Sequence, residues 1–153
     1  YFHVHELNAK AFASDIFSGD GIFRLVMPAN AVEDDLRLII AEHAAASVQD
    51  GLTPVGSVYE IVTEPAVGDL GTPAPIHIRF GTETATAAST ATAATSLLIH
   101  RWDETTQRWA PLPTTVGNEQ QMASAQTARL GRFGLFWTEA ESVIKLYLPL
   151  MDR

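Results

Sequence analysis

The sequence contains no cysteine, so disulfide bonds, thiolate nucleophiles and structural zinc sites with cysteine ligands are all excluded. It has 10 lysine and arginine residues against 18 aspartate and glutamate residues, which gives a formal net charge of −8 at pH 7. Nucleic-acid binding needs clustered basic side chains that release counterions, so we expect no nucleic-acid partner. No apolar run approaches the roughly 20 residues that cross a bilayer, and no transmembrane segment is predicted.

The length of 153 residues suits one domain that buries a sizeable core. The chain begins with Tyr1 rather than Met. Such a start is expected for a processed chain, for example one that has lost a signal peptide, or for an excised piece.

The most informative pattern that is present is a tryptophan hairpin between Ser96 and Pro113. An apolar run ends at Trp102, a polar turn follows, and a second short run begins at Trp109. Two such runs around a short polar turn are typical of an antiparallel β-hairpin.

Further short apolar segments are separated by glycine, proline and acidic turns. The predicted strands are residues 1–7, 22–27, 36–41, 56–62, 76–80, 122–128 and 132–137. Residues 36–41 also suit a helical segment, but their β-branched side chains favour a strand. Many short strands without a helical period predict an all-β fold, an antiparallel two-sheet β-sandwich with strand-like terminal extensions.

Two further expectations concern the core and one unusual tract. Residues 82–96 are almost entirely Thr, Ala and Ser, which predicts a long solvated loop, or alternatively an O-glycosylated or contact-making loop. Alternate strand positions supply the predicted core. Its members are Tyr59, Ile61, Ile78, Phe80, Leu98, Trp102, Phe133 and Leu135.

The order of several segments carries a family resemblance. They are Met27–Val32 after a strand, Val58–Ile61, Pro73–Ile78, the hairpin Ile99–Pro113, and Ala128–Phe136. In this order they resemble the ZU-type β-sandwich domain of ankyrins, netrin receptors and zonula-occludens proteins, looser versions of which occur in bacterial surface proteins.

The resemblance covers about residues 18–137. It implies a β-sandwich domain over residues 18–137, an N-terminal strand or extension over 1–17 and a C-terminal strand or tail over 138–153. It also implies a non-enzymatic interaction module without a cofactor, secreted or at a bacterial cell surface.

Some members of that family cleave their own chain at a His-Phe-Ser sequence. The matching residues here are Arg132, Phe133 and Gly134. Gly134 has no hydroxyl nucleophile, and the guanidinium of Arg132 stays protonated and cannot act as a base. We therefore expect no self-cleavage.

The remaining residues give little support to catalysis or metal binding. No Gly-x-Ser-x-Gly, phosphate-loop or dinucleotide motif occurs, so we predict neither an enzyme nor a cofactor. His3 and His5 share one face of the first strand, but without a zinc-binding pattern no metal site is predicted. Asp20 and residues 33–35 have no EF-hand spacing and are interpreted as solvated turns.

Both chain ends are apolar and strand-like, and they suggest self-association. Strand addition at a sheet edge, repeated head to tail, would join copies into an oligomer or filament or dock them on other cell-surface proteins. The candidate residues are Phe2, Val4, Ile144, Leu146, Tyr147 and Leu148. The alternatives are docking of both ends within one chain, and a monomeric adhesion domain that binds a glycan on an exposed, coplanar platform of Trp102 and Trp109.

Overall fold

The computed structural model describes residues 2–7, 14–32, 35–45, 51–90 and 95–139. These residues form eleven strands and one helix. In chain order the elements are β1 (Phe2–Leu7), β2 (Ser14–Phe17), β3 (Phe23–Met27), β4 (Leu36–His43), β5 (Leu52–Glu64), β6 (Asp69–Arg79), α1 (Thr82–Thr90), β7 (Thr95–Asp103), β8 (Arg108–Pro111), β9 (Thr115–Gly117), β10 (Met122–Arg129) and β11 (Arg132–Glu139). No helix in these ranges is long and apolar enough to cross a membrane.

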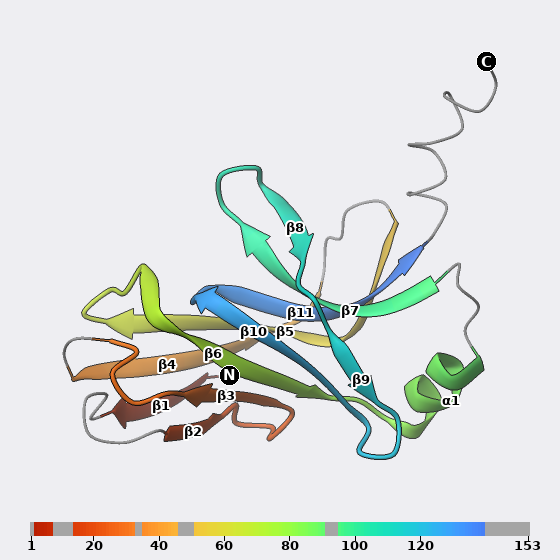
Figure 1. Ribbon diagram of the computed structural model, residues 1–153, viewed down its shortest axis with the longest axis horizontal. Helices are drawn as coiled ribbons and strands as arrows, with labels where there is room; N and C mark the ends of the chain where they lie inside the picture. Colours follow the sequence, from red (N-terminus) through yellow and green to blue (C-terminus); the bar gives the residue numbers. More distant parts are fainter. Residues whose placement is uncertain (1, 8–13, 33–34, 46–50, 91–94, 140–153) are drawn as a thin grey trace.

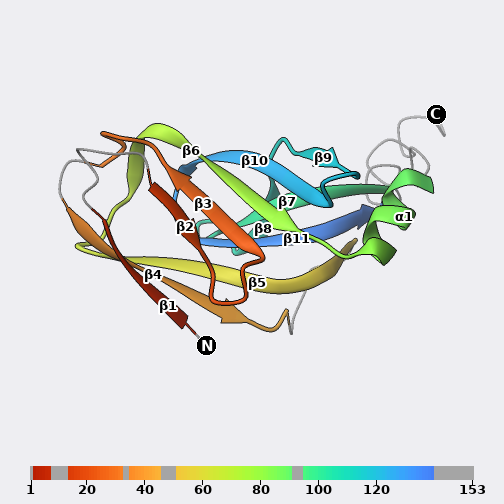
Figure 2. The same ribbon diagram turned by 90° about the horizontal axis from the view of Figure 1, so that it is seen from below.

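Two antiparallel sheets form the two layers of a sandwich (Figure 1). The six-stranded sheet has the order β1-β4-β5-β11-β7-β8, and the five-stranded sheet has the order β2-β3-β6-β10-β9. Figure 2 shows β3, β6 and β10 in one layer, with β4, β5 and β11 in the other. The predicted all-β, two-sheet sandwich is confirmed.

The core lies between the sheets and is filled by alternate side chains of both. Phe23 stacks on Tyr59 and on Phe133, with ring centroids 5.2 and 6.0 Å apart. Six of the predicted core residues are buried: Tyr59, Ile61, Ile78, Phe80, Phe133 and Leu135. Period-two burial therefore holds along most of the strands that the sequence indicates.

The core prediction is wrong for Leu98 and Trp102, which are only half-buried. Ile99 pairs with Leu135 across β7 and β11, and its side chain enters the core instead. Successive residues of a strand point to opposite faces, so Leu98 and Trp102 lie on the outer face of the six-stranded sheet.

That outer face carries a second, smaller apolar cluster. Val58, Trp109 and Phe136 are buried there, and Trp102 packs partly against them. His100 lies beside this cluster, 2% exposed, with its ring 5.2 Å from that of Phe136 in an edge contact. Apolar side chains thus cover part of each face of the six-stranded sheet.

The prediction of a loop over residues 82–96 is wrong, because Thr82–Thr90 form α1 and β7 begins at Thr95. Alanine has the highest helix propensity, and its small side chain packs closely. Ala85 and Ala88, one turn apart, pack against the core from one end of the sandwich (Figure 1). Gln121 also donates a hydrogen bond to the Thr82 hydroxyl, 3.3 Å away.

Strand β6 also begins earlier than expected, at Asp69 instead of residue 76. It contains Pro73 and Pro75, residues that usually end a strand because they lack an N–H donor. The pairing of β6 with β3 covers only Ile76 to Ile78. The prolines therefore lie where β3 no longer needs hydrogen-bond donors from β6.

Candidate functional site

The N-terminal strand β1 is an edge strand of the six-stranded sheet. It pairs with β4 of the same chain along its whole length, from Phe2 opposite Ala41 to Leu7 opposite Leu36. No strand in the described ranges pairs with its other side. The backbone groups on that side are available to another chain.

An apolar row runs from this edge across the outer face of the sheet. The register places Val4 opposite Ile39, and Ile39 opposite Val62. Val4 is 44% exposed and Val62 is 45% exposed, so two of the three side chains face solvent. We call these three residues the edge stripe.

The other self-association candidates cannot be placed in the same way. The backbone of Phe2 lies in β1, but its side chain is outside the described structure. Ile144, Leu146, Tyr147 and Leu148 belong to residues 140–153, which lie outside the described ranges. Their part in self-association stays a prediction.

The predicted hairpin is formed by β7 and β8, and its two tryptophans lie opposite each other. Their ring centroids are 5.5 Å apart and their planes meet at 72°. Trp109 is only 7% exposed and packs on Phe136 at 4.9 Å. The pair therefore does not form an exposed, coplanar platform, and Trp102 alone keeps a partly exposed ring.

One end of the hairpin borders a small cleft of about 170 Å³. Three arginines and Trp102 line it together with the hairpin turn and two loops. The residues are Val67, Gly68, Arg101, Trp102, Asp103, Glu104, Thr105, Arg129, Leu130, Gly131 and Arg132. In the sequence Arg129 and Arg132 lie three positions apart and Arg101 is distant from both, and the pairing of β7 with β11 brings Arg101 close to Arg132.

The histidines make separate local contacts. His77 and Ser124 are cross-strand neighbours on β6 and β10, with Nδ1 and Oγ 2.7 Å apart. Burial, together with the nearby charge of Arg24, lowers the pKa of His77, while Asp15 opposes that shift. Burial also lowers the pKa of His100.

No group of three or more His, Asp or Glu side chains suited to a metal ion occurs among the described residues. His3 and His5 have no described side chains. Asp20 is held by protein donors instead: Tyr59 Oη lies 2.7 Å from its Oδ2, and the Ile22 N–H donates to its Oδ1. Burial opposes ionisation of Asp20, but these bonds and one from Ser18 outweigh it and leave its pKa below the ordinary value.

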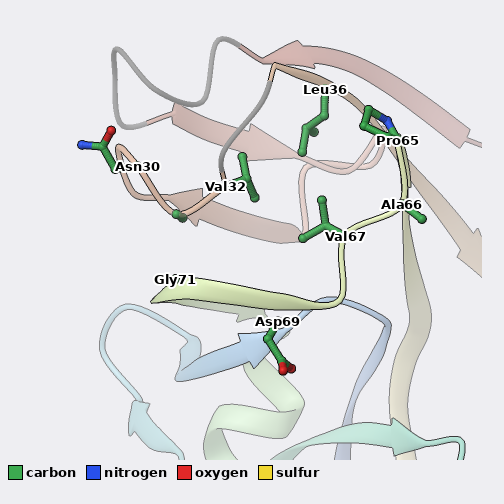
Figure 3. A pocket seen from close by; sticks show the side chains of 9 residues that line it. Asn30, Val32, Leu36, Pro65, Ala66, Val67, Asp69 and Gly71 are labelled. Carbon is green, nitrogen blue, oxygen red and sulfur yellow. The ribbon is translucent and has the colours of Figure 1, made fainter.

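Two larger hollows lie elsewhere, each of about 430 Å³. One is walled mainly by the apolar side chains of Val32, Leu36 and Val67, and Asp69 points away from them (Figure 3). The other lies on the five-stranded sheet beside His77 and Ser124. The arginine-lined cleft differs from both in that several charged side chains line it.

No family model matches the chain, and no curated protein matches it.

Proposed function

We propose that this chain is a non-enzymatic structural module of a bacterial cell surface, and that its copies associate by strand addition at the open edge of β1. The observation that carries the proposal is the six-residue β1 strand, which has one side paired with β4 and the other side open. The order of segments that resembles the ZU-type domain supports an interaction module at a cell surface.

The four edge strands differ in how well they would accept another strand. β2 and β8 have four residues each, and β9 has three. β8 also ends with Pro111, which has no N–H to donate. β1 is longer and contains no proline or lysine, two residues that commonly protect an edge from pairing, and its one acidic side chain is Glu6 near its end.

The edge stripe adds apolar surface beside these free backbone groups. A strand added to β1 would cover part of Val4 and extend the row that continues through Ile39 and Val62. Backbone hydrogen bonds and alternate side chains act together in such an addition. A contact between two different surfaces, repeated from copy to copy, gives a filament unless it closes into a ring.

A Val4→Lys variant tests the proposal without disturbing the core, because Val4 is 44% exposed. The matched control is Ile22→Lys, at a residue that is 40% exposed in the turn before β3. We expect light scattering and electron microscopy to show concentration-dependent assembly of the wild type and of Ile22→Lys. Val4→Lys should remain monomeric. A wild type that stays a monodisperse monomer at high concentration would rule out the proposed assembly.

A further inference from the structure

The arginine cleft is the cavity defined above at one end of the β7–β8 hairpin. The connection between β5 and β6 and the turn between β10 and β11 form two of its walls. Both views place these connections at the end of the sandwich away from α1 (Figures 1 and 2). The cleft is therefore built by loops that a rigid sheet holds in place.

Three of the guanidinium groups of an acidic chain meet there, and they are incompletely satisfied. Arg129 pairs with Asp69 at 2.9 Å, and one terminal nitrogen of Arg132 lies 3.4 Å from Glu60. The Nε atom of Arg132 is buried and has no hydrogen-bond partner. Within the described residues, the Arg101 side chain has no hydrogen bond or ion pair, and its charge attracts the nearby Asp103 carboxylate. The guanidinium of Arg101 therefore remains for a ligand, whereas the Nε atom of Arg132 is shielded from the cleft.

The acidic side chains of the cleft are largely engaged by the hairpin turn. The Asp103 carboxylate accepts hydrogen bonds from the Thr105 and Thr106 amides, at 2.9 and 3.5 Å. Glu104 accepts one from Gln107 at 3.3 Å. Three guanidinium groups and two carboxylates line the cleft, and Asp69 and Glu60 pair with Arg129 and Arg132 from beside it, so these groups together carry a formal charge of −1. Arg101 is then the guanidinium left for a ligand, and a single guanidinium matches one carboxylate better than a doubly charged phosphate.

The position of Trp102 narrows the ligand class. Gly134 pairs with His100, and strand alternation places Trp102 and Arg132 two residues away on the same outer face. Trp102 is half-buried, so part of its indole ring is open to the cleft. An indole surface suits the apolar face of a ring-shaped ligand, and a planar guanidinium suits a carboxylate.

We propose that the arginine cleft binds the carboxylate of a uronic-acid residue in an acidic polysaccharide. Arg101 holds the carboxylate, and Trp102 covers the sugar ring. The cleft is independent of the edge stripe, so copies joined through β1 would display it repeatedly.

The test is calorimetric titration of the full chain with an oligomer of galacturonic acid. The methyl ester of the same oligomer, poly-glutamate and inorganic phosphate serve as the comparison ligands. We expect that only the free acid binds, and that its binding changes the tryptophan fluorescence. Raising the salt concentration from 0.15 to about 0.5 M should weaken the binding, because exposed charges are then screened.

Arg101→Gln is the decisive variant, because its side chain has no described hydrogen bond whose loss would disturb the fold, and its described interaction is the attraction between its charge and the Asp103 carboxylate. We expect affinity to fall about tenfold or more, the usual effect of losing a hydrogen bond between charged groups. Arg108 is an exposed neighbour outside the cleft, and Arg108→Gln should leave the affinity unchanged.

Several results would overturn the proposal. They are absence of binding by the free acid, equal binding of its methyl ester, or equal or tighter binding of poly-glutamate or phosphate. Unchanged affinity in Arg101→Gln would also overturn it, provided that the variant unfolds at the same temperature as the wild type.

Discussion

Replacing Gly134 by alanine should destabilise the protein through one specific contact on the outer face of the six-stranded sheet. A Cβ atom at this position would lie 2.8 Å from Cε2 and 2.9 Å from Cζ of Phe136, and 3.4 Å from a methyl carbon of Val58. Carbon atoms pack best at about 3.5–4.0 Å. The Phe136 ring would therefore have to move by about 0.7 Å or more.

That ring has little room to move. Phe136 is 1% exposed, and its centroid lies 4.9 Å from that of Trp109 and 5.2 Å from that of His100. Overpacking of this kind costs about 1–3 kcal/mol. Removing the flexibility of glycine from the unfolded chain returns about 0.4–1 kcal/mol. The net loss in the free energy of unfolding should be about 0–2.6 kcal/mol, with a central value of about 1.3 kcal/mol.

Urea unfolding followed by tryptophan fluorescence measures this loss. Gly131→Ala is the matched control, because a Cβ there would meet no atom within 4 Å. In the double variant Gly134→Ala with Phe136→Leu, the smaller side chain should relieve part of the clash and give a measurable coupling energy. If Gly134→Ala matches Gly131→Ala, or if the coupling is zero, the steric explanation fails.

Three further predictions concern the core and the buried polar groups. Phe133→Ala should lower the free energy of unfolding by about 3–5 kcal/mol, because the ring is fully buried; a loss below about 1 kcal/mol in urea unfolding would contradict its place in the core. Tyr59→Phe should cost about 1–3 kcal/mol by the same assay, since it removes a 2.7 Å hydrogen bond to a charged Asp20 carboxylate. The pKa values of His77 and His100 lie below the ordinary 6.5, so as the pH falls the unfolded chain binds protons at these two histidines before the folded chain does. The free energy of unfolding should therefore fall as the pH drops below about 6.5. Urea midpoints at pH 7.5 and 5.5 measure this fall, and replacing both histidines by glutamine should reduce it; a fall of equal size in that variant would assign the effect to other groups.

The fold could be predicted because its main signals are local. Strand-like residues and turn residues alternate along the chain, and the pairing of Trp102 with Trp109 follows from the turn between them. The helix over Thr82–Thr90 could not be predicted in this way. Thr, Ala and Ser suit a solvated loop equally well, and the contacts of Ala85 and Ala88 with the core decide the outcome.

The candidate sites were less accessible to sequence analysis because they depend on register. Whether Trp102 or Arg101 faces the core changes with a shift of one residue, and nothing near them in the sequence fixes the choice. Arg101 and Arg132 are 31 positions apart and meet only because β7 pairs with β11. In the sequence Arg101 lies close to Arg108, and Arg129 lies close to Arg132, and this spacing indicates no common site.

The contact between β1 and β4 also predicts how a shortened chain will behave. Removing residues 1–7 leaves β4 as the new edge, an eight-residue strand whose Leu36, Leu38 and Ile40 contribute to the core. Such a longer apolar edge should aggregate more readily than the open side of β1. A synthetic peptide with the sequence of residues 1–7 should bind the shortened chain and keep it soluble, because it restores the same antiparallel register. Sedimentation measures the soluble fraction, and a peptide with the same residues in scrambled order is the control. If the shortened chain stays soluble without peptide, or if both peptides act equally, then β1 does not protect the β4 edge.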